Sequence, residues 1–244
     1  MITDIFTVAG KELREIFVQG DPRGRSRWFL VIMIGIFGVL LPLQSGREWV
    51  TSPISIVVWG WMPFQWVSGI VADSFAGERE RHTLEALLAT RLSDRAILFG
   101  KLLASLLYGF VLTMLILLVS LITVNLVYGR GELILFPLSM ALGAMIFSIL
   151  ISGLAAGLGV LVSLRAGSVR QAQQMMSLGL LVLFVPFLAF QFLPPSMATA
   201  IHDFFVQMNI AQIVLGVVIV LIVIDLALIG IDIQLFKRSK LILD

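Results

Sequence analysis

The sequence has no cysteine, two histidines and few charged residues. Without cysteine, disulfides and thiolate metal sites are excluded. Charged residues make up 13% of the 244-residue chain, against roughly 25% in an ordinary soluble domain. His82 and His202 lie in segments that we expect on opposite sides of a membrane, so we expect no histidine-based metal site. The composition is not that of an ordinary soluble domain.

Common catalytic motifs are also missing. A P-loop needs the pattern G-x-x-x-x-G-K-[ST], and neither Gly10-Lys11 nor Gly100-Lys101 fits it. The chain has no H-E-x-x-H and no G-x-S-x-G motif. We therefore expect that this chain is not an enzyme and binds no cofactor or metal itself.

Long apolar runs dominate what remains. Hydrophobic residues make up 59% of the chain, and the mean hydropathy is +1.04. Several runs approach or exceed the roughly 20 residues that cross a bilayer as a helix. The sequence predicts an all-α polytopic membrane protein with a single transmembrane domain, 1–244. Its six predicted spans are Trp28–Leu43, Pro53–Ala72, Leu102–Tyr128, Leu133–Val162, Met175–Leu193 and Ile213–Phe236.

The basic residues predict an orientation. All of the 17 Lys and Arg residues except Arg47 and Arg130 fall on one side of the predicted spans. Because Lys and Arg are enriched in cytoplasmic loops, both termini are predicted to be cytoplasmic. The order is then a cytoplasmic amphipathic helix (1–27), spans 1 and 2 (28–72), a charged cytoplasmic segment (73–101), spans 3 and 4 (102–162), a cytoplasmic loop (163–174), span 5 (175–193), an external loop (194–212), span 6 (213–236) and a cytoplasmic tail (237–244).

Two segments outside the spans are amphipathic. Ile2–Val18 has apolar residues at helical spacing, which is typical of a helix lying on the inner membrane surface. An ordinary solvated tail is the alternative. The external loop, opened by Pro194-Pro195, is predicted to form a short re-entrant or interfacial helix between spans 5 and 6.

The charged segment Asp73–Lys101 is the most informative part of the chain. Strong helix formers predict a helix between Gly77 and Leu92, and Ser93 is a suitable N-cap for a second helix that continues through Lys101 into span 3. A partner that pressed on these helices would tilt spans 2 and 3. The alternative is a charged loop that only sets topology.

These residues resemble those of a known family. The run Gly77-Glu78-Arg79-Glu80-Arg81-His82-Thr83-Leu84-Glu85-Ala86-Leu87-Leu88, then Leu92-Ser93 and Gly100-Lys101-Leu102, is similar to the charged segment of type-2 ABC transporter permeases. Lys11-Glu12-Leu13-Arg14-Glu15 resembles the opening helix of that family. His82 replaces the usual Gly, and Arg91 replaces the usual Pro.

The resemblance implies a role for each part. The segment between spans 2 and 3 would be a coupling helix, seated on one of two cytoplasmic ABC ATPase subunits that use ATP and Mg²⁺. Its coupling residues would be Glu78, Arg79, Glu80, Thr83, Leu84, Glu85, Leu87 and Leu88. A second permease, identical or paralogous, would complete an exporter in the lipid of a prokaryotic inner membrane, with no nucleic acid involved.

Polar and aromatic residues inside the spans are candidates for a transport pathway. Asp225 is the most costly of them, because a carboxylate inside a bilayer must be protonated, paired or hydrated. It belongs either to a pathway or to a contact between helices, and Asp232 follows on the same face. Further candidates are Trp59, Trp66, Gln65 and Asn125. Gly153 and Gly157 form a small-xxx-small pattern that favours helix packing.

Two other functions stay open. The chain could be an ion-coupled secondary transporter or channel that uses Asp225, or a membrane scaffold or sensor without transport. The charged segment favours the ABC permease, because a secondary carrier has no need of a docking helix. The sequence does not identify the substrate, the transport direction or the partner permease.

Overall fold

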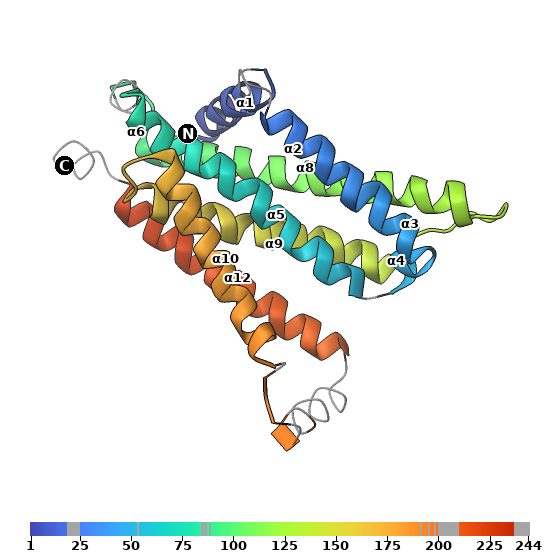
Figure 1. Ribbon diagram of the computed structural model, residues 1–244. Coiled ribbons are helices and arrows are strands. Elements are labelled where there is room, and N and C mark those ends of the chain that lie inside the picture. Colours follow the sequence, from blue (N-terminus) through green and yellow to red (C-terminus); the bar gives the residue numbers. More distant parts are fainter. Residues whose placement is uncertain are drawn as a thin grey trace.

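The chain folds into a bundle of long helices (Figure 1). The computed structural model describes residues 1–18, 25–52, 54–83, 87, 89–190, 192–194, 196, 197, 199 and 210–236. Every regular element within these ranges is a helix, which confirms the all-α prediction for the part described.

The first long rod is built from three consecutive elements. They are α2 (Arg25–Met33), the π-helix η1 (Ile34–Leu40) and α3 (Leu41–Ser45). Met33 and Leu41, at the two junctions, both have right-handed helical dihedrals, so the rod is continuous. It ends at Gly46, whose φ of 60° suits a residue without a side chain. A short α4 (Glu48–Thr51) follows.

The second rod carries the start of the charged segment. It joins α5 (Ile54–Ala72), the π-helix η2 (Asp73–Gly77) and α6 (Glu78–Glu80). The continuous helix predicted between Gly77 and Leu92 is wrong, because Arg81 leaves the helix and His82 has a φ of 56°. Residues 84–86 and 88 lie outside the described residues.

The next two helices begin at local signals. α8 (Asp94–Tyr128) starts as predicted, since the Ser93 hydroxyl accepts a hydrogen bond of 3.2 Å from the Ala96 N–H. α9 (Leu138–Ser163) starts five residues later than predicted, because Pro137 is extended, with a ψ of 140°. Its carbonyl accepts the first hydrogen bonds of α9.

Two helices complete the bundle. α10 (Val169–Phe190) packs on α9 and α5, whereas α12 (Ile210–Leu235) packs on α9 (Figure 1). The helix predicted between spans 5 and 6 falls mostly outside the described residues.

Four helical stretches of the described chain are long and apolar enough to cross a membrane. They are Trp28–Ser45, Asp94–Tyr128, Leu138–Ser163 and Gln212–Leu235. The two other predicted spans, Pro53–Ala72 and Met175–Leu193, overlap α5 and α10, and α10 begins six residues before its predicted start.

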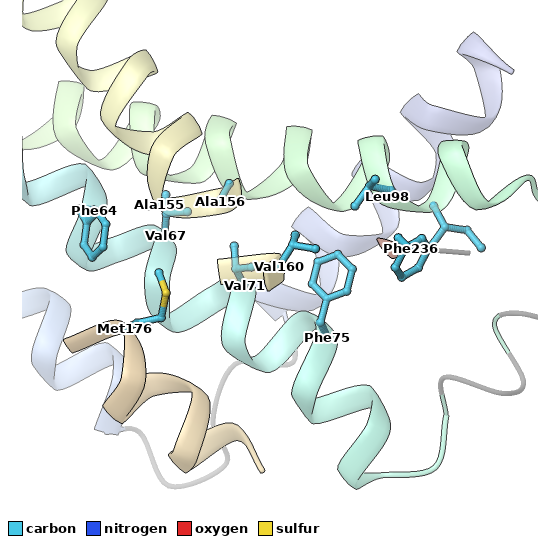
Figure 2. Packing of buried hydrophobic residues seen from close by; sticks show 11 residues of the cluster. Phe64, Val67, Val71, Phe75, Leu98, Ala155, Ala156, Val160, Met176 and Phe236 are labelled. Carbon is cyan, nitrogen blue, oxygen red and sulfur yellow. The ribbon is translucent and has the colours of Figure 1, made fainter. Parts of the chain in front are cut away.

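The largest core cluster lies between α5, α8, α9, α10 and the end of α12 (Figure 2). Phe75 and Phe236 meet edge to face, with centroids 5.7 Å apart. Such a pair adds about 1 kcal/mol beyond the area that it buries. The cluster reaches one end of the bundle through Phe75 of η2 and through Ile97 and Leu98 of α8. We call this the α1 end, by which we mean α1 (Ile2–Val18), η2, α6 and the first turns of α8 and α10.

Candidate functional site

Lys101 forms the centre of a buried ion cluster at the α1 end. Its side chain has no solvent exposure. Its Nζ lies 2.8 Å from Glu12 Oε1, which belongs to α1, and 2.9 Å from Glu78 Oε1, which belongs to α6. A lysine on α8 thus joins three segments that are far apart in the sequence.

Ser74 and Phe75, in the π-helical turn η2, complete the surroundings of Lys101. The Lys101 ammonium donates to the Ser74 carbonyl at 2.9 Å and to its hydroxyl at 3.1 Å. That hydroxyl in turn donates to Glu12 Oε2 at 2.9 Å. The ammonium also lies 5.4 Å from the centre of the Phe75 ring, within range of a cation–π contact.

Carboxylates outnumber ammonium groups in this cluster. Glu12 and Glu78 share Lys101, and Glu78 Oε2 is buried without a hydrogen-bond partner in the described structure. The pKa of Lys11, on the outside of α1, is shifted in part by these carboxylates. Burial lowers its pKa, but Glu15 at 3.2 Å, and more weakly Glu12 and Glu78, raise it above the usual value. The α1 end thus has a negative interior.

Close approach of two helices makes the cluster possible. α1 crosses α8 at Gly100, where a Cβ atom would lie 2.5 Å from Val8 Cβ and 3.0 Å from the Ile5 carbonyl oxygen. Val8 and Ala9 are buried in this contact. A side chain at position 100 would move α1 outward and draw Glu12 away from Lys101.

Arg79 and Glu80 connect α6 to the turn between α9 and α10. The Arg79 guanidinium donates to the carbonyls of Leu164, at 2.6 Å, and Ala166, at 3.3 Å. Glu80 Oε2 accepts a hydrogen bond of 3.1 Å from the Val169 N–H, at the start of α10. A carboxylate there also meets the positive end of the helix dipole. Both side chains therefore hold α9 and α10 to the charged segment.

The rest of the charged motif stabilises the turn after α6. Arg81 forms an ion pair of 3.1 Å with Asp73. The N–H and the hydroxyl of Thr83 both donate to the Glu78 carbonyl, at 2.8 and 3.2 Å. His82, between them, has the left-handed backbone that favours glycine.

The predicted coupling residues therefore divide into groups. Glu78, Arg79, Glu80 and Thr83 make contacts within the chain. Leu87 packs partly buried against the core cluster of Figure 2. Leu84, Glu85 and Leu88 lie outside the described residues. Contact of any of them with an ATPase stays a prediction.

Sequence reasoning did not select Glu12, Ser74 or Lys101 as site residues. A signal was present, because α8 places Lys101 inside a run of apolar residues, where an ammonium needs a carboxylate partner. Which carboxylate it meets depends on how α1 and α6 pack, and the sequence does not show that.

The aromatic pathway candidates of α5 are buried within the chain. Trp59 is 2% exposed and lies between Trp49 and Phe136, with ring centroids at 6.4 and 5.0 Å. Trp66 is 8% exposed and meets Phe29 edge to face. A role for either indole in a pathway stays a prediction.

The polar pathway candidates differ in their surroundings. Gln65 is exposed on α5. Asn125 instead closes the connection between α8 and α9: its Oδ1 accepts from the Ile134 N–H, and its Nδ2 donates to the Ile134 and Leu121 carbonyls, each at 2.8 Å. These three hydrogen bonds satisfy the Asn125 amide, so a structural role accounts for this polar residue without a role in transport.

Asp225 and Asp232 lie where α12 packs on α9. A Cβ atom added at Gly153 would be 2.9 Å from Asp225 Oδ2, and one at Gly157 would be 2.9 Å from Leu228 Cβ and 3.5 Å from Asp232 Oδ2. The predicted common face and the predicted glycine packing are confirmed. Asp232 is fully buried, and both of its carboxylate oxygens lack hydrogen-bond partners in the described structure.

The described residues contain no cluster of three or more His, Asp or Glu side chains that could hold a metal ion. At the α1 end, one ammonium, two carboxylates and the contacts of Arg79 and Glu80 join five helices: α1, α6, α8, α9 and α10.

Comparison with known proteins identifies the family. Residues 67–215 match the model of the ABC-2 family transporter proteins, which covers more than half of the chain. No curated protein matches the chain with significance. The matched region includes the charged segment, Lys101, and all of α8, α9 and α10. The chain therefore belongs to the ABC-2 family of transporter proteins, as a multi-pass membrane component of an ABC transporter.

Proposed function

We propose that this chain is the permease subunit of an ATP-driven exporter. Six helices cross the inner membrane, with both termini and the α1 end in the cytoplasm. Two permease chains, identical or paralogous, form the pathway, and two ATPase subunits that bind ATP and Mg²⁺ drive it. The distribution of Lys and Arg supports the orientation.

The Lys101 cluster is the observation that carries this proposal. Breaking a buried ion pair by removing one partner costs about 3–5 kcal/mol. A force applied to the charged segment therefore moves α1, α6 and α8 together, instead of bending a loop. Arg79 and Glu80 pass the same movement to α9 and α10.

The predicted coupling residues have different roles, which follow from their contacts. Glu78, Arg79, Glu80 and Thr83 fix the charged segment to the bundle. We assign direct ATPase contact to the part of the segment beyond Thr83, including Leu84, Glu85 and Leu88. The acidic Glu85 would meet a basic group of the ATPase.

Purification from a strain that expresses the neighbouring genes tests the proposal. An ATPase should copurify with the tagged wild-type chain, and Glu85→Arg should remove it or uncouple its activity from transport. Glu132→Arg is the matched control, because Glu132 is exposed at the opposite end of α8 and α9. An ATPase-free oligomer from all three preparations would contradict the proposal.

One observation keeps an ion-coupled transporter as the second candidate. Asp225 lies within a candidate span, and its Oδ1 is buried without a partner in the described structure. Flux that stops in Asp225→Asn and needs an ion gradient, but no ATP, would favour that alternative. In an ATP-driven permease, Asp225→Asn should retain ATP-dependent flux.

A further inference from the structure

The first rod (α2, η1 and α3) contains a proline that weakens its helix. Pro42 has no N–H, and in a regular α-helix the N–H at this position would pair with the Gly38 carbonyl. The proline ring also crowds that carbonyl, because it lies one turn away. The helix before Pro42 is the wider π-helix η1, in which the Leu41 N–H donates to the Ile36 carbonyl. The rod therefore has a weak point between Gly38 and Pro42.

Thr123 of α8 supplies a donor in place of the missing N–H. Its hydroxyl donates to the Gly38 carbonyl at 2.8 Å, and it lies 2.9 Å from the carbonyl of Val119, one turn back in its own helix. A hydroxyl has a single proton to share between these two acceptors. Gly38 permits the approach, since a Cβ atom there would lie 2.8 Å from Val119 Cγ1. The Thr123 hydroxyl thus has an acceptor whether or not the rod contacts α8.

The part of the rod beyond Pro42 is fixed to α8 by polar contacts. The Tyr128 hydroxyl donates to the Leu43 carbonyl at 2.6 Å. Arg47, just after α3, donates to the Tyr128 carbonyl from Nε at 3.2 Å and from Nη2 at 3.1 Å. These contacts connect the end of α3 and the end of α8 in both directions, so α3 cannot move without α8.

The part of the rod before Gly38 is held only by apolar contacts. Phe29 meets Trp66 edge to face, with ring centroids 5.8 Å apart. Within Trp28–Ser45, all of which the structure describes, the only buried residues are Gly38 and Pro42. The rod is therefore most closely packed at its weak point, and α2 has no polar contact that fixes its direction.

We propose that the first rod bends between Gly38 and Pro42, and that Thr123 is the latch that holds it against α8. When the Thr123 hydroxyl turns to Val119, α2 moves away from α8 while α3 stays bound to Tyr128. Because α2 follows α1 in the chain, the α1 end can then move without displacing the opposite end of the bundle. Thr123 is a positioning residue, and the inference goes beyond the proposed function because it requires no ATPase.

Distances between spin labels in the purified full-length chain test the latch. Because the chain has no cysteine, Val31→Cys with Ile149→Cys reports on α2, and Leu43→Cys with Ile149→Cys reports on α3. All three positions are exposed. Thr123→Val removes the hydroxyl and keeps the shape of the side chain. It should enlarge the population with displaced α2 about fivefold, as expected for the loss of one ordinary hydrogen bond. The Leu43 pair should not change.

Two further variants separate the latch from a general loss of packing. Thr123→Ser keeps the donor, so it should retain the wild-type distances. Thr113→Val is the matched control, because Thr113 is also buried on α8 but donates to the Gly109 carbonyl of its own helix, at 2.8 Å. It should leave both label pairs unchanged. A change in Thr113→Val as large as in Thr123→Val would overturn the proposal, as would Thr123→Ser that behaves like Thr123→Val.

Pro42→Ala tests the cause of the weak point. Alanine restores an N–H that can pair with the Gly38 carbonyl, so the rod no longer needs the Thr123 hydroxyl. Thr123→Val should therefore change the Val31 pair much less in Pro42→Ala than in the native chain, which is a coupling between the two positions. Equal effects in both backgrounds would overturn the proposal. An unchanged Val31 pair in Thr123→Val, or an equal change in the Leu43 pair, would overturn it as well.

Discussion

At the scale of single residues, Lys101 carries its charge between two carboxylates and out of contact with solvent. Such an arrangement adds little net stability compared with apolar residues of the same shape, because all three groups lose their hydration. It does define a geometry, since Glu12, Glu78 and Lys101 each fit in one place. A fixed geometry at this cluster would let a force on one of the three helices reach the other two.

Lys101→Met should lower the free energy of unfolding by about 3 kcal/mol, because it leaves two buried carboxylates without their cation. Thermal unfolding in mild detergent measures the change. Lys11→Met is the control: that side chain is 52% exposed in its ion pair with Glu15, so we expect a change below about 0.5 kcal/mol. Equal effects of the two substitutions would show that the buried cluster has no special role.

At His82 we expect a substitution that raises the free energy of unfolding. Its φ of 56° is unfavourable for a residue with a side chain. We expect His82→Gly to stabilise the fold by up to ~1 kcal/mol, after allowance for the greater freedom of glycine in the unfolded chain. His82→Val should destabilise it, since β-branched residues avoid this region. A stabilising valine would show that the turn after α6 does not have this backbone.

At the scale of elements, the position of α1 depends on its contact with α8. Gly100 permits that contact, and the Lys101–Glu12 pair fixes its register. Beside this contact α1 exposes Ile2, Phe6 and Phe17, each more than half exposed. An amphipathic helix with exposed apolar side chains suits a location between the bundle and a membrane surface.

Gly100→Ala tests this contact, because the new Cβ atom would lie 2.5 Å from Val8 Cβ. We expect a loss of about 1–3 kcal/mol from overpacking and faster hydrogen exchange in α1. Gly10→Ala is the matched control on α1 itself, where a Cβ atom meets nothing within 4 Å. It should be neutral or stabilise the helix by up to ~1 kcal/mol. Unchanged exchange in Gly100→Ala would place α1 elsewhere in the membrane-embedded protein.

The two π-helical stretches differ in what they do. η1 lies within the first rod and packs on α8, where the Gly38 carbonyl accepts the Thr123 hydroxyl at 2.8 Å. η2 lies where the second rod leaves α5, and it directs Ser74 and Phe75 toward Lys101. Single π-turns are common at functional sites, and η2 fits that pattern.

At the scale of the whole molecule, orientation in the membrane is the property most open to a direct test. The absence of cysteine makes the chain suitable for single-cysteine labelling. Arg91→Cys, in the charged segment, should react with a membrane-impermeant maleimide in inside-out vesicles but not in intact cells. Glu132→Cys, at the opposite end, should show the reverse pattern. Reaction of both from one side would contradict the proposed topology.

Helix type and start sites were readable from the sequence where the signal is local. Apolar runs predicted the long helices, and Ser93 predicted the start of α8. The break at Arg81 and His82 was missed because residues with high helix propensity surround it, and tertiary contacts outweigh propensity there. Thr83 and Asp73 hold this turn through Glu78 and Arg81.

The sequence by itself determined that this protein is helical, membrane-embedded and asymmetric in charge, because hydropathy and charge are properties of each segment alone. Tertiary structure decided how the charged motif is used. Glu78 is buried against Lys101, whereas Arg79 and Glu80 contact the end of α9 and the start of α10. Partners 23 to 89 residues away define these roles, and pairing at that separation depends on helix packing that no local pattern records.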